Sequence, residues 1–310
     1  MSKAHEITSI ENVKEILRLI KVHFAQLGKN DVHGDRYSNA KAMIARVFKN
    51  TNGQNKLDVM TRLALIDNLY ATQMDHRYFA FDDLAGQLLK ESRKGSGAFV
   101  CDESIADKEL WNKQYGIGKG GEEKGVAISL ISKYGYFATG FKFPIFDSIV
   151  CETIPLVWPF VVGVGSPKIK SLSQNRNLNG VEKITQVVKA VNQLKENLGD
   201  DADYETLDCL LWTTGKMMKG NFEWFFSRKD YLKWRDIWKE KASRIDPKGT
   251  SHFSEKLSKE NKTNGKKHLV IGDSIKKLEV DELPFLKTPG NEHLRKLYEL
   301  AHELALSTQK

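Results

Sequence analysis

The sequence predicts an all-α fold, and three observations support this prediction. Apolar residues recur at spacings of three and four along most of the 310-residue chain, which is the spacing of one helix face. The clearest of these apolar stripes runs over residues 181–194. Strand-like alternation is rare, and residues 98–101 and 268–271 are the best candidates for strands. We therefore expect a helical protein with short strands as a minor component.

Six amphipathic stripes give the expected helices in chain order. They cover residues 10–20, 57–73, 84–89, 181–194, 207–212 and 294–304. Asp203 or Thr206 is placed to cap the fifth, because a side-chain oxygen there can accept from the free amides of the first turn. The segment 247–267 is rich in lysine and poor in apolar residues, which is typical of a mobile loop. We expect a helical domain over residues 1–246, with a basic loop and a C-terminal helix packing on it over 247–310.

The composition is that of an ordinary globular protein with a basic surplus. Apolar residues make up 40% of the chain, and 48 Lys and Arg face 40 Asp and Glu. A net charge of +8 suits a polyanionic partner, but on charge alone a merely basic protein is the favoured explanation. No apolar run approaches the roughly 20 residues of a membrane span, and residues 1–17 lack a signal-peptide core. Three scattered cysteines suit a reducing compartment. We expect a cytoplasmic protein without membrane contact.

The motifs that bind phosphates or metals are incomplete. Segment 115–125, YGIGKGGEEKG, contains GxGxG without the preceding strand that a phosphate-binding fingerprint needs. Glu122-Glu123-Lys124 has the spacing of a metal-dependent nuclease but lies in a polar loop, where a solvated charge run is the simpler interpretation. The eight histidines show no ligand spacing. We expect neither a metal site nor a cofactor.

One carboxylate stands in an apolar segment, KFPIFDSIV at residues 142–150. Burying an unpaired carboxylate costs free energy or raises its pKa, so Asp147 needs a reason to follow Phe143 and Phe146. One interpretation is that Asp147 caps a helix that begins here. The other is that it acts on a substrate in a dry site, where the helix N-terminus keeps it ionised. Capping explains the aspartate but not the aromatic wall, so catalysis is favoured.

Two segments resemble the helix-hairpin-helix (HhH-GPD) superfamily of DNA base-excision glycosylases. Residues 63–89 are similar to the family's early helix and its Leu-x-x-x-Gln turn, which ends here at Gln73. Residues 129–150 are similar to the helix, Pro-x-x-Asp loop and next helix that carry the family's essential aspartate. Pro144 and Asp147 hold those two positions.

The resemblance covers about residues 55–240, with a weaker match at 205–216, and implies two helical subdomains around a cleft. It also implies a DNA glycosylase. Cleavage of an N-glycosidic bond leaves positive charge on the sugar, which the Asp147 carboxylate would stabilise while activating water. The base must leave the duplex to reach such a site. We expect a monomeric protein that binds double-stranded DNA. The sequence leaves two alternatives for the released base, a damaged base or a modified base of phage DNA.

The resemblance also places the other site residues. The candidates for DNA contact are Gln73, Lys119, Gly120, Gly121, Lys124, Ser129, Lys142 and Ser148. The candidates for the base pocket are Tyr70, Tyr78, Tyr136 and Phe137, although aromatic residues at helical spacing are more often core residues. Gln73 would fill the gap that the base leaves in the duplex, and an exposed helix-end residue is the alternative.

The sequence departs from the family pattern in two places. The family's Leu-Pro-Gly-[Val/Ile]-Gly hairpin, whose main-chain N–H groups hold a DNA phosphate, is absent, and the loop at 115–125 could replace it. The lysine nucleophile of bifunctional members would fall near Ser129, and Lys124 and Lys133 lie away from that position. The resemblance therefore favours a monofunctional enzyme that uses water. A non-catalytic nucleic-acid-binding protein with the same helical fold is the alternative.

Overall fold

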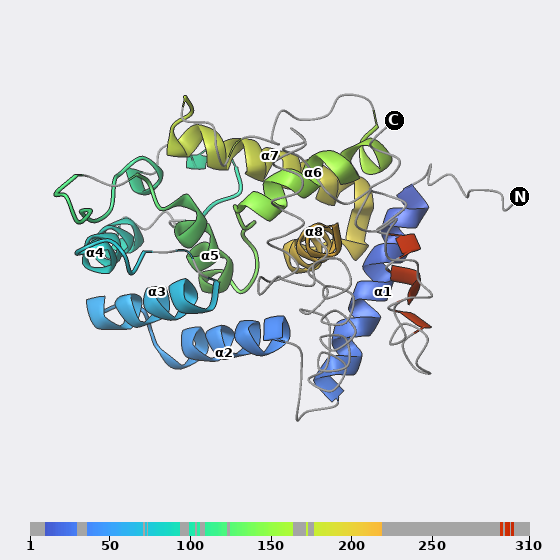
Figure 1. Cartoon of the computed structure of the whole chain (residues 1–310), viewed down its shortest axis with the longest axis horizontal. Helices are drawn as coiled ribbons and strands as arrows, with labels where there is room; N and C mark the ends of the chain where they lie inside the picture. Colours follow the sequence, from blue (N-terminus) through green and yellow to red (C-terminus); the bar gives the residue numbers. More distant parts are fainter. Residues whose placement is uncertain are drawn as a thin grey trace, which may run out of the picture. The chain divides into compact units, whose positions relative to one another are not determined.

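The described part of the chain is helical, which confirms the all-α class (Figure 1). The computed structural model describes residues 10–29, 36–70, 72, 74–93, 99–102, 104–105, 109–122, 125–163, 172, 177–218, 292–293, 295–297 and 299–300. These residues contain no strand, and one isolated antiparallel bridge joins Tyr78 to Ile117.

The prediction of a strand at 98–101 is wrong for residues 99–101, which are the part of it that the structure describes. These residues are half-buried, and Phe99 packs edge-on against Trp111 and Phe143 without forming a β-ladder. The strand expected at 268–271 and the lysine-rich segment 247–267 lie outside the described residues.

The helices occur where most of the stripes predict them. Their bounds are α1 Ile10–Lys29, α2 Arg36–Asn50, α3 Lys56–Tyr70, α4 Ala80–Arg93, α5 Ile128–Ala138, α6 Ser148–Val161, α7 Gly180–Leu198 and α8 Tyr204–Met218, with short 3-10 turns at Glu109–Trp111 and Gly199–Asp201. The expected helix at 57–73 ends at Tyr70. α2, α5 and α6 had no counterpart among the stripes, although the resemblance over residues 129–150 implied a helix on each side of the Asp147 loop. The described residues between 292 and 300 are helical, as expected for the last helix.

Contacts divide the chain into two compact units. One unit is Ala40–Asp208, and the other draws on Met1–Asn39 and Cys209–Lys310. The boundary expected near residue 247 lies outside the described residues and stays a prediction, as does the arrangement of two subdomains around a cleft.

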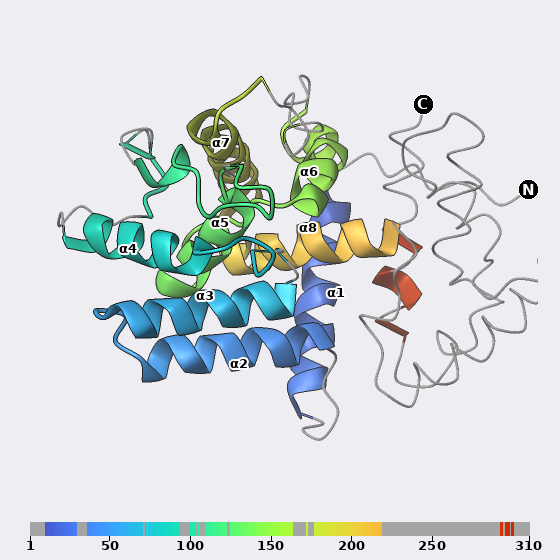
Figure 2. The ribbon, with the colours of Figure 1, turned by 60° about the vertical axis from the view of Figure 1, so that its left-hand side comes forward.

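Within the unit Ala40–Asp208, α5 is buried along most of its length. α3 packs against both α4 and α5, and α6 packs against α7 (Figure 2). Phe48 of α2 contacts the rings of Tyr134 and Phe137 on α5. Nine of the 11 residues of α5 are buried, including Ser132 and Lys133. A helix that is covered on nearly every face places any polar side chain it carries in the protein interior.

Polar residues at the N-termini of two later helices set where those helices begin. Asp203 Oδ1 accepts from the Thr206 amide at 2.7 Å, so Asp203 is the cap of α8. Asn179 and Glu182 form a reciprocal capping box at the start of α7.

Candidate functional site

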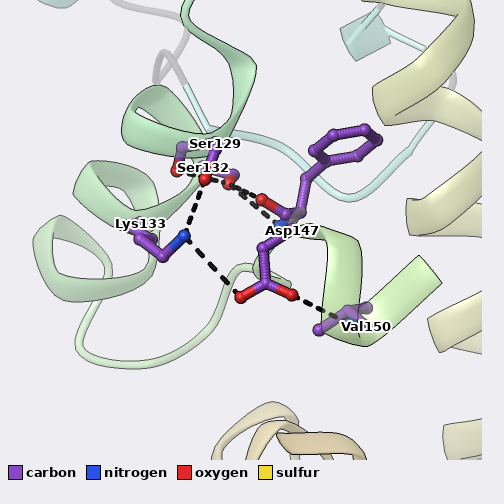
Figure 3. Close-up of polar contacts among 6 residues, drawn as sticks. Ser129, Ser132, Lys133, Asp147 and Val150 are labelled. Atoms are coloured by element: carbon purple, nitrogen blue, oxygen red, sulfur yellow. Dashed lines mark hydrogen bonds and ion pairs between the residues drawn. The ribbon is translucent and has the colours of Figure 1, made fainter. Parts of the chain in front are cut away.

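Asp147 is the N-cap of α6, which confirms the capping interpretation. Its backbone is extended, and its Oδ1 accepts from the Val150 amide at 2.8 Å. The other oxygen, Oδ2, lies 3.7 Å from Lys133 Nζ (Figure 3). One oxygen of the Asp147 carboxylate therefore caps α6, and the other faces Lys133 on α5.

Lys133 is a buried lysine on α5. Its side chain is 4% exposed, and Nζ donates to Ser129 Oγ at 2.7 Å and lies 5.5 Å from the Tyr70 ring centre. Burial lowers the pKa of Lys133 below its ordinary value, and the nearby Asp147 and Asp208 carboxylates oppose this by favouring the charged form. Lys133 therefore loses its proton to form the neutral amine more readily than a surface lysine does.

Ser132 fixes the Asp147 loop against α5. Its hydroxyl accepts from the Phe146 amide at 2.9 Å and lies 3.3 Å from the Phe146 carbonyl oxygen, to which it can donate (Figure 3). Phe143, which is fully buried, stacks on Trp111 with ring centres 5.8 Å apart. The aromatic residues before Asp147 therefore anchor the loop in the core, and these contacts hold Asp147 opposite Lys133.

The Asp147 carboxylate is reachable from solvent, whereas the lysine behind it is not. The Asp147 side chain is 19% exposed, against 4% for Lys133. Charge interactions are stronger in such a partly desolvated place than in bulk water. The cluster of Asp147, Lys133 and Ser129 can therefore stabilise positive charge, accept a proton or supply an amine nucleophile.

The structure brings one of the expected DNA-contact residues, Ser129, into this cluster through Lys133. Ser148 and Lys142 flank Asp147 in the chain and are exposed. Gln73 and Lys124 lie outside the described residues.

The glycine-rich loop is a tight turn that is closed on itself. The Gly118 amide donates to Glu122 at 2.8 Å, and the Gly121 amide donates to Gly118 at 3.0 Å. Two of the main-chain donors that could hold a phosphate are thus used within the loop. Lys119 and Gly120 are exposed at its tip.

The four expected pocket aromatics occupy different environments. Tyr70 is half-buried beside Lys133, and Phe137 is buried and contacts it edge-on. Tyr136 is fully buried against Phe137 and Phe141, which is the core role that helical spacing favoured. Tyr78 is 57% exposed.

The sequence analysis sets Lys133 aside because it lies four residues after Ser129, the position that the resemblance assigns to a lysine nucleophile. A residue four positions later lies on the same helix face, one turn on, so Lys133 belongs to the site. A single lysine within the apolar run ISLISKYGYF was the available signal, because such a residue must be buried with its helix.

No known protein-family model matches the chain, and neither the curated proteins nor the solved structures yield a match. None of the helices in the described residues is long and apolar enough to cross a bilayer. The same residues contain no group of three or more His, Cys, Asp or Glu side chains placed to hold a metal ion.

Proposed function

We propose that the protein is a monofunctional DNA glycosylase. It would hydrolyse the N-glycosidic bond of a flipped damaged or modified base and leave an abasic site, either in repair or in defence against phage DNA with modified bases. The observation that supports this proposal is the partly exposed Asp147 carboxylate, held at a helix N-terminus opposite a buried lysine.

In the proposed reaction, Oδ2 of Asp147, which is the oxygen not used to cap α6, acts on the sugar. As the bond from C1′ to the base nitrogen breaks, the bonding electrons leave with the base and positive charge develops on the sugar. The carboxylate stabilises that charge and takes a proton from the water that adds to C1′. One oxygen of this carboxylate caps the α6 N-terminus, and the other lies 3.7 Å from Lys133 Nζ.

The position of Lys133 supports a second candidate reaction. Its neutral amine, favoured by burial, could attack C1′ in place of water and displace the base, forming a Schiff base after ring opening. This reaction requires Lys133, whose side chain is 4% exposed, to move out towards the substrate. The enzyme would then be bifunctional.

Borohydride trapping separates water from lysine attack. We expect no covalent protein–DNA adduct when the wild-type protein is incubated with substrate and borohydride, because hydrolysis by water forms no reducible imine. The measurement is the shifted protein band on a denaturing gel. An adduct that disappears in Lys133→Gln and persists in Lys189→Gln, a control at an exposed lysine of α7, would instead establish the lysine reaction.

A non-catalytic nucleic-acid-binding protein with the same fold is the alternative from another functional class. A panel of duplexes, each carrying one damaged or modified base, tests the two proposals together. Alkali-labile abasic sites report base release, and gel mobility reports binding. Release from at least one duplex supports the glycosylase, whereas binding without release across the panel supports the alternative.

A further inference from the structure

Three large apolar side chains are exposed together beside the glycine-rich loop. Tyr78 is 57% exposed, Phe79 is 69% exposed and Ile117 is 40% exposed. The bridge between Tyr78 and Ile117 brings them together, with N–H···O distances of 2.9 Å in both directions. We call these three residues the aromatic knuckle.

Phe79 adopts an unfavourable backbone conformation without the packing that normally compensates for it. Its φ is +62°, in the left-handed region that bulky residues rarely occupy. Phe141 also has positive φ, at +69°, but its ring packs on Tyr136 with ring centres 4.8 Å apart. Exposed residues held in strained conformations are characteristic of binding sites.

The knuckle is held rigidly in this exposed position. A Cβ atom on Gly116 would lie 2.9 Å from the Tyr78 carbonyl oxygen, so the two chain segments approach as closely as glycine allows. Arg77 Nη1 donates to the Gly125 carbonyl at 2.7 Å, and the Phe79 carbonyl accepts from Asp83 in the first turn of α4. The aromatic rings are therefore presented at little cost in conformational entropy.

The knuckle is also connected to the candidate site at both ends. It closes the connection that leaves α3 at Tyr70, whose ring lies next to Lys133. The Gly125 carbonyl, which Arg77 holds, is four residues before Ser129, so the chain between them spans at most about 14 Å.

We propose that the aromatic knuckle stacks on a nucleobase of bound DNA next to the flipped nucleotide, with Phe79 as the main contact. This inference rests on the proposed glycosylase function. Flipping leaves neighbouring bases without a stacking partner, and an aromatic face can replace it.

Charged residues of both signs lie around the knuckle. Lys113 and Lys119 are exposed near Ile117 in the chain and could contact phosphates. Of the neighbouring acids, Asp82 pairs with Lys56 at 2.7 Å and Asp83 accepts from the Gly116 amide, whereas Asp75 and Glu122 are exposed.

Phe79→Gly tests the proposal, because glycine relieves the positive φ while removing the ring. The probe is a duplex with a tetrahydrofuran abasic-site analogue and 2-aminopurine as the base adjacent to it, compared with an undamaged duplex of the same sequence. We expect Phe79→Gly to weaken binding of the abasic duplex roughly 5- to 100-fold and to reduce 2-aminopurine quenching. Phe79→Trp should retain both, and thermal stability of Phe79→Gly should not fall.

Met43→Ala is the matched control, because Met43 is 47% exposed on α2 and is expected to leave binding unchanged. Equal affinity of Phe79→Gly and wild type for the abasic duplex would contradict the proposed stacking by the knuckle, while leaving the glycosylase proposal intact. A wild-type protein that binds neither duplex would overturn both.

Discussion

Asp147→Asn is expected to lower the rate of base release about 10²-fold or more while the protein stays folded. Asparagine caps a helix about as well as aspartate, so the bond from the Val150 amide should persist. What the substitution removes is the negative charge opposite Lys133, which the reaction needs both to stabilise the sugar cation and to accept a proton. Single-turnover release of base from the substrate found in the duplex panel measures the effect, and thermal unfolding checks the fold.

Asp203→Asn provides the matched control for Asp147→Asn. Asp203 caps α8 through the Thr206 amide in the same geometry, but it is not part of the Lys133 cluster. We expect this variant to keep wild-type turnover. If Asp147→Asn also kept it, Asp147 would be a helix cap alone and the catalytic proposal would fail.

Gly180→Ala is expected to destabilise the protein by about 3 kcal/mol, the upper range for overpacking a close contact. A Cβ atom at Gly180 would lie 1.6 Å from the Trp111 carbonyl oxygen, and a main-chain atom cannot move aside as a side chain can. The start of α7 would have to shift away from the 3-10 turn at Glu109–Trp111. Urea unfolding followed by circular dichroism measures the loss.

Gly86→Ala is expected to change the stability of the protein in the opposite direction. Gly86 lies within α4, and its added Cβ would meet no atom within 4 Å. The substitution should therefore raise stability by about 0.5–1 kcal/mol through helix propensity alone. Equal destabilisation by the two substitutions would contradict the close contact at Gly180.

Much of the helical framework follows from local signals in the sequence. The stripe at 181–194 predicts α7, and Asp203 was one of two residues named as the cap of α8, because periodicity and capping act over a few neighbouring residues. The capping role of Asp147 is of the same kind. α2 was missed although Tyr37, Ile44, Val47 and Phe48 lie at helical spacing. The expected strand near residue 99 failed because half-buried Phe99 packs against rings that are distant in sequence.

The sequence by itself determined the all-α class, the positions of most helices, and Asp147 as a carboxylate at a helix N-terminus in an apolar segment. Only the tertiary structure decided what faces that carboxylate. Lys133 reaches Asp147 because α5 is buried on nearly every face and Ser132 ties the following loop back to it. Such an arrangement depends on packing between segments 14 residues apart, for which neither helical periodicity nor motif spacing carries a signal.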